Sequence, residues 1–142
     1  MKLTLLTCIL FLTIFGFSQT RYYSDPMKIP LNLSASFGEL RSNHFHSGID
    51  IKTKGVTGLP VNSVADGFIS RIAISPVGFG HALYIDHPNG TTTVYAHLQS
   101  FRDDIEAYVK GEQYNQKSFR VDLQVPPEKF KVVQNEIIAY SG

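Results

Sequence analysis

Two β-rich runs flank an Asn-Gly pair in the stretch HALYIDHPNGTTTVY, residues 81–95. An Asn-Gly pair between such runs is a strong short-range signal for a β-hairpin, so an antiparallel pair of strands is predicted here. Strict alternation would place Tyr95 and His97 on one face of the second strand, and Val94 and Leu98 on the other. We therefore expect His97 to leave the sheet on its more polar side.

Further strands are predicted on both sides of this hairpin. Residues 119–125 alternate strictly between apolar and polar side chains, which is typical of a half-buried strand. Other short runs rich in β-branched or aromatic residues lie at 67–75, 130–132 and 137–140. The sequence predicts a β-dominated fold, an antiparallel sheet or open sandwich with long loops and little helix.

One short helix is predicted at residues 103–108. Asp103 is its expected N-cap, and Gly111 is expected to stop it.

The N-terminal segment has the features of a secretory signal. Lys2 precedes an uncharged apolar run at residues 3–17, which is shorter than the about 20 residues needed to span a membrane. We expect residues 1–18 to be a cleaved signal peptide and residues 19–30 an extended lead-in. Residues 31–142 then form one domain, and the chain is predicted to be exported to the periplasm, cell envelope or medium.

Composition excludes several classes of protein. The only cysteine, Cys8, lies inside the predicted signal, so the mature chain has neither disulfides nor cysteine ligands for a metal. Without Lys2 the chain carries 12 basic and 12 acidic residues, a formal charge of zero. No nucleic-acid partner is expected, and no membrane partner after signal cleavage.

His46 and Asp50 lie four residues apart with Gly48 midway between them. In a straight strand their Cα atoms would be about 13 Å apart, so the chain must bend if both are to bind one metal ion. Gly48 permits a bend and leaves space beside the ion. An isolated His-x-x-x-Asp spacing is a weak signal, and a local chelate of His44, His46 and Asp50 is an alternative.

The surrounding fragments make the signal specific. They are FGELR at 37–41, HSGID at 46–50, Gly55, Pro60-Val61, ADG at 65–67, Gly80, IDH at 85–87, Gly90 and YAHL at 95–98. Their order resembles the lysostaphin/LytM-type zinc metalloendopeptidases, peptidase family M23, over residues 33–98 and 136–142. Residues 99–134 look like an insertion in that family's pattern.

The resemblance implies that His46 and Asp50 are ligands of Zn²⁺ and that His97 is a catalytic histidine. It also implies a third zinc ligand in a His-x-His segment, which would follow Gly142, so the chain is expected to be a piece of a longer protein. The implied function is zinc-dependent hydrolysis of peptide bonds in bacterial peptidoglycan. The alternatives are a non-catalytic wall-binding or hydrolase-regulating module with a degenerate zinc site, and a secreted β-domain that binds protein or glycan.

Overall fold

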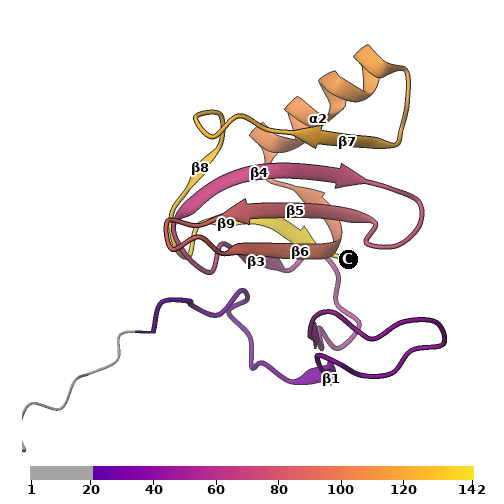
Figure 1. Cartoon of the computed structure of the whole chain (residues 1–142), viewed down its shortest axis with the longest axis vertical. Coiled ribbons are helices and arrows are strands. Elements are labelled where there is room, and N and C mark those ends of the chain that lie inside the picture. Colours follow the sequence, from indigo (N-terminus) through magenta and orange to yellow (C-terminus); the bar gives the residue numbers. More distant parts are fainter. Residues whose placement is uncertain (1–20) are drawn as a thin grey trace, which may run out of the picture.

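The computed structural model describes residues 21–142 (Figure 1). The predicted signal peptide, residues 1–18, lies outside the described residues. The elements in chain order are β1 (Leu33–Ala35), β2 (Asp50–Ile51), β3 (Pro60–Asn62), β4 (Gly67–Ile74), β5 (His81–Asp86), β6 (Thr92–Phe101), α2 (Asp103–Gln116), β7 (Val121–Gln124), β8 (Lys131–Val132) and β9 (Ile137–Ser141).

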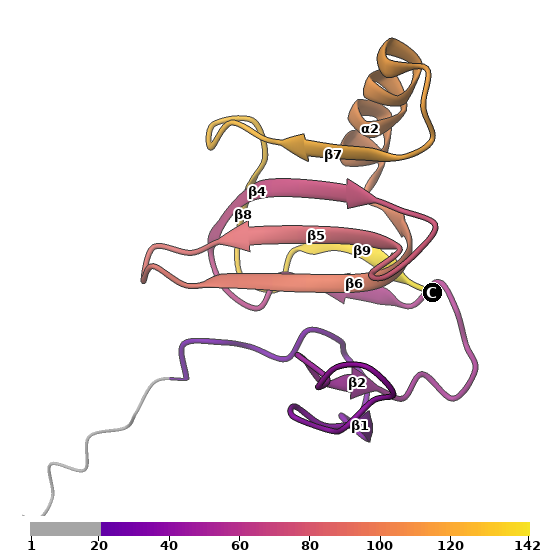
Figure 2. The same ribbon diagram turned by 45° about the vertical axis from the view of Figure 1, so that its right-hand side comes forward.

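Seven of the strands form one curled antiparallel sheet in the order β3-β9-β6-β5-β4-β7, with β8 also paired to β4. Strands β1 and β2 form a separate two-stranded antiparallel sheet. Figures 1 and 2 show this small sheet beyond β3 and β6, while α2 lies beside β7 at the opposite end of the main sheet. The predicted β-dominated antiparallel class is confirmed.

The predicted hairpin is present as β5 and β6, but its second strand does not alternate as expected. Leu83 pairs with Tyr95 and His81 pairs with Leu98, so two residues of β6, Ala96 and His97, oppose a single residue of β5. This extra residue is a β-bulge, which shifts the side-chain alternation by one position. Tyr95 and Leu98 are consequently both buried while His97 is exposed, and the predicted grouping of Tyr95 with His97 is wrong.

The helix is longer than predicted. α2 begins at Asp103 after the N-cap residue Arg102, continues through Gly111 and ends at Gln116, and the C-cap residue Lys117 adopts a left-handed conformation with φ 49°. The predicted N-cap and the predicted stop at Gly111 are therefore wrong. Ile105 and Val109, four residues apart, are buried against the sheet, and their packing outweighs the about 1 kcal/mol helix penalty of a glycine.

An ion-pair network joins the start of α2 to the turn before β9. Arg102 donates to both carboxylate oxygens of Asp104 and also to Glu136. Hydrogen bonding to this guanidinium lowers the pKa of the Asp104 carboxyl. The network thereby holds the start of α2 against the turn that precedes β9.

The C-terminal strands follow the predicted pattern closely. In β7, Val121 and Leu123 are buried and the two residues that alternate with them are exposed. Phe119, predicted as part of this strand, lies outside it and is 91% exposed. Strands β8 and β9 lie where the runs at 130–132 and 137–140 predicted them.

Residues 21–30 form no helix or strand, yet they pack against the main sheet. The backbone N–H of Ser24 donates to the carbonyl of Val64 at 2.7 Å, and Asn62 donates to the carbonyl of Pro26 at 2.7 Å. Met27 is 6% exposed and belongs to the hydrophobic core. Within the described range, none of the helices is long and apolar enough to cross a membrane.

Candidate metal and catalytic site

The loop between β1 and β2 carries most of the candidate site. It folds back on itself through a bridge between Leu40 and Phe45. The backbone N–H of His46 donates to the backbone carbonyl of Glu39 at 2.8 Å, and the backbone N–H of Arg41 donates to the backbone carbonyl of His44 at 2.9 Å. These bonds fix the backbone that carries Arg41 and His46, just before β2 begins at Asp50.

The bend expected between His46 and Asp50 brings their side chains together. Nε2 of His46 lies 3.2 Å from Oδ1 of Asp50. Apart from Gly48 itself and its two chain neighbours, no described heavy atom lies within 4 Å of the position that a Cβ would occupy on Gly48. The glycine therefore leaves open space beside the pair, as its position in the sequence predicted.

The contact of Nδ1 of His46 indicates which of its two ring nitrogens carries the proton. Nδ1 lies 3.1 Å from the carbonyl oxygen of Ser36, which can only accept a hydrogen bond. In the neutral ring Nδ1 must therefore carry the proton, which leaves Nε2 as an acceptor directed at a carboxylate oxygen. Two acceptors 3.2 Å apart require a proton or a cation to join them.

Asp50 uses its other oxygen differently. Nη2 of Arg41 donates to Oδ2 of Asp50 at 3.2 Å, and the same nitrogen lies 3.9 Å from Glu39. One carboxylate oxygen is thus held by a guanidinium, while the other faces the imidazole.

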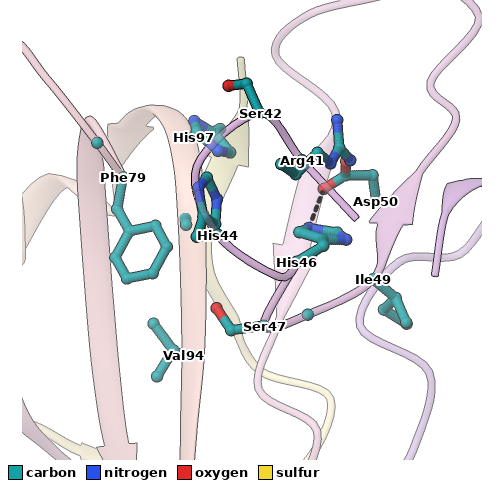
Figure 3. A pocket seen from close by; sticks show the side chains of 13 residues that line it. Arg41, Ser42, His44, His46, Ser47, Ile49, Asp50, Phe79, Val94 and His97 are labelled. Carbon is teal, nitrogen blue, oxygen red and sulfur yellow. Dashed lines mark hydrogen bonds and ion pairs between the residues drawn. The ribbon is translucent and has the colours of Figure 1, made fainter. Parts of the chain in front are cut away.

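A cavity of about 760 Å³ brings the three predicted site residues together. His46 and Asp50 lie on one wall, which the loop at 41–50 forms, and His97 of β6 lines the cavity from the side of the main sheet, as do Phe79 and Val94 (Figure 3). His97 is at the bulge, with φ 55°. The bulge therefore directs this histidine away from the core and into the cavity.

His44 also lines the cavity, but it does not join His46 and Asp50 as a third ligand. Its Nδ1 lies 2.6 Å from the side-chain oxygen of Asn43. In residues 21–142, no three His, Cys, Asp or Glu side chains are gathered closely enough to hold a metal ion. The geometry does not favour the alternative chelate of His44, His46 and Asp50.

The remaining histidines have structural roles. His87 is 5% exposed, and its two ring nitrogens bond to the carbonyl of Asp66 and the hydroxyl of Thr93. Nδ1 of His81 lies 3.2 Å from the carbonyl of Gln99.

Sequence reasoning missed Arg41 as a site residue. It lies nine positions before Asp50, and no local spacing rule connects the two residues. Only the fold of the loop brings them into contact.

An imidazole and a carboxylate that face a second imidazole across an open cavity form a donor set typical of metal-dependent hydrolases. Residues 44–114 match the family described as peptidase family M23. This match covers half of the sequence, and the chain belongs to that family.

Named relatives agree with this assignment. The chain is 39% identical over 72 residues to the DD-carboxypeptidase/endopeptidase Mpg of Neisseria meningitidis serogroup B, an alignment that covers 51% of this chain and 16% of that protein. It is 34% identical over 83 residues to the cell division protein DipM of Caulobacter vibrioides, covering 58% and 13% respectively. The chain thus spans less than one fifth of the length of these relatives.

Proposed function

We propose that this protein is a zinc-dependent endopeptidase that hydrolyses peptide bonds in bacterial cell-wall peptidoglycan. The observation that carries the proposal is the close approach of Nε2 of His46 and Oδ1 of Asp50, 3.2 Å apart, in a cavity that His97 also lines. Family membership supports peptide hydrolysis, and the names of the relatives Mpg and DipM support a role at the cell wall.

The spacing of the two acceptors fits zinc. Tetrahedral zinc with bonds of about 2.0 to 2.2 Å places two of its ligand atoms about 3.3 to 3.6 Å apart. The observed separation of 3.2 Å is close to that value. The bond from His46 to Ser36 supports the same reading, because a metal-binding histidine commonly donates its other N–H to a carbonyl. When bound, zinc would supply Lewis acidity at the carbonyl and lower the pKa of water toward about 7.

His97 is the group of this chain that we propose to act on the reacting atoms. It lies across the cavity from His46 and Asp50, so a peptide bound between the two walls would be within reach of its ring. An imidazole in this place can accept or donate a proton, or hydrogen-bond to the oxyanion that forms at the carbonyl. Its role is catalytic rather than metal-binding.

A catalytic zinc site normally has three protein ligands, and the described residues bring only His46 and Asp50 together. The proposal therefore includes a third ligand supplied from elsewhere in the full-length protein, and the tests below use that protein. We also propose export directed by residues 1–18, since peptidoglycan lies outside the cytoplasm. Mass spectrometry of the protein from the envelope fraction would detect the loss of this segment.

Zinc content and turnover separate the proposed roles. His46→Ala and Asp50→Ala should each abolish retention of zinc through dialysis, because each removes one donor atom. His97→Ala should keep zinc and lower the digestion of purified sacculi by about 10²- to 10⁴-fold, the usual contribution of general acid–base catalysis. His44→Ala is the matched control, because His44 lines the same cavity and should keep its zinc.

Zinc loss in the His97 and His44 variants as well would contradict the assigned roles. A full-length wild-type protein that is metal-free and leaves sacculi undigested would overturn the proposal. That result would favour the alternative, a non-catalytic wall-binding or hydrolase-regulating module.

A further inference from the structure

Arg41 is the one lysine or arginine among the described residues that line the cavity. We infer that Arg41 is a positioning residue, which holds Oδ2 of Asp50 so that Oδ1 is presented beside Nε2 of His46. The inference rests on the proposed function, because the group to be positioned is a proposed zinc ligand. It adds a residue whose role neither the spacing of the motif nor the family match assigns.

The argument begins with the freedom of Asp50. Its side chain is 40% exposed, so the carboxylate has room to rotate away from His46. The contact from Nη2 of Arg41 to Oδ2 at 3.2 Å opposes that rotation. Arg41 can restrain Asp50 because its own backbone is held in a turn, where its backbone N–H donates to the carbonyl of His44.

A second arginine of the chain shows what a purely structural ion pair looks like. Arg71 donates to both oxygens of Asp122, from Nε at 2.7 Å and from Nη2 at 2.6 Å. Arg41 engages only one oxygen of Asp50 and leaves the other facing His46. A ligand carboxylate needs this division, since one oxygen must remain free for the metal.

The guanidinium is poorly suited to bind an anionic substrate group instead. Asp50 and Glu39 already lie 3.2 and 3.9 Å from Nη2, so its charge is compensated. Its Nε is buried and has no hydrogen-bond partner in the described structure, so that nitrogen is closed to a ligand in the cavity. These contacts favour a role directed at Asp50.

Partners that orient metal ligands typically contribute 10- to 100-fold to metal affinity. Arg41→Ala should therefore weaken zinc binding by about that factor, measured by competition with a chromophoric chelator. Arg41→Lys keeps a charge and a donor and should recover part of the loss. Arg71→Ala is the matched control, because it removes the same charge from a distant ion pair and should leave zinc affinity unchanged.

A spectroscopic measurement makes the test independent of turnover. In the cobalt-substituted protein, Arg41→Ala should shift the visible absorption bands of the metal, while Arg71→Ala should not. Thermal unfolding in the presence of a chelator checks that the variants are folded. If Arg41→Ala fails to fold, Arg41→Lys provides the comparison of affinity and spectrum with the wild type.

Unchanged zinc affinity and an unchanged cobalt spectrum in both Arg41 variants would overturn the inference while leaving the proposed function intact. A rise in KM alone, with zinc affinity unchanged, would also overturn it and would indicate contact with substrate. A metal-free wild-type protein would overturn the proposed function, and the inference with it. The wild-type zinc measurement therefore distinguishes the two failures.

Discussion

At the scale of single residues, the position of His97 depends on a close backbone contact. The N–H of Gly142 donates to the carbonyl of His97 at 3.1 Å, directly after β9. A Cβ added at Gly142 would lie 2.6 Å from that carbonyl oxygen, which is closer than real Cβ atoms approach a neighbour. Only glycine fits beside the bulge that carries His97.

Gly142→Ala should therefore displace His97 and lower turnover by about 10- to 100-fold, since a shift of about 1 Å at a catalytic group has effects of this size. Zinc loss in this variant would show that the substitution also reaches the proposed third ligand, which would follow Gly142, and not His97 alone. The measurements are sacculus digestion and zinc analysis on the same preparation.

Gly111→Ala serves as the control for this substitution, because the described structure leaves open space around its Cβ position. Wild-type turnover in the Gly142 variant would show that the close contact does not position His97.

At the scale of elements, the site joins the loop between β1 and β2 to strand β6. The loop supplies Arg41 and His46, the first residue of β2 supplies Asp50, and the bulge in β6 supplies His97. Neither element contains the complete set. The two sheets must therefore keep their relative position for the proposed chemistry to occur.

Helix α2 provides a test of how packing overrides local preference. Gly111 is exposed in the middle of the helix, and a Cβ there would meet no described atom within 4 Å. Gly111→Ala should raise the free energy of unfolding by about 0.5 to 1 kcal/mol, because it lowers the entropy of the unfolded chain and improves helix propensity. Urea denaturation at equilibrium measures the change.

Gly90→Ala should instead lower the free energy of unfolding. Gly90 has φ +82° in the turn between β5 and β6, a conformation that an alanine adopts only with strain. If Gly111→Ala destabilises the protein instead, Gly111 ends the helix as its sequence context first suggested.

At the scale of the whole molecule, residues 21–30 are part of the folded unit. Met27 lies in the core although it belongs to no helix or strand itself. It also lines a second cavity, of about 570 Å³, which shares Asp50 and His97 with the first. Residues 21–30 thus contribute both to stability and to the surroundings of the site.

Met27→Ala should lower the free energy of unfolding by about 2 to 5 kcal/mol, the usual cost of truncating a buried methionine. Phe119→Ala is the control, because Phe119 is 91% exposed and its removal should change stability by no more than about 0.5 kcal/mol. Both values come from urea denaturation. An equally small effect at Met27 would mean that residues 21–30 do not stabilise the domain.

The sequence by itself determined the strands and the hairpin, because alternation and an Asn-Gly turn are local properties of the chain. Residues 81–86, 121–124 and 137–140 are strands as predicted. It also identified His46, Asp50 and His97 as candidates, through their place among the motif fragments. Local sequence rules did not predict where the helix ends, because the burial of Ile105 and Val109 outweighs the low helix propensity of Gly111.

Only the tertiary structure decided how the candidates meet. The bulge at His97 depends on the register between β6 and β5, and a single strand carries no record of its partner's register. The contacts of Arg41 and Ser36 depend on a loop that folds back between two strands. Such contacts join residues through space, so spacing along the chain does not predict them.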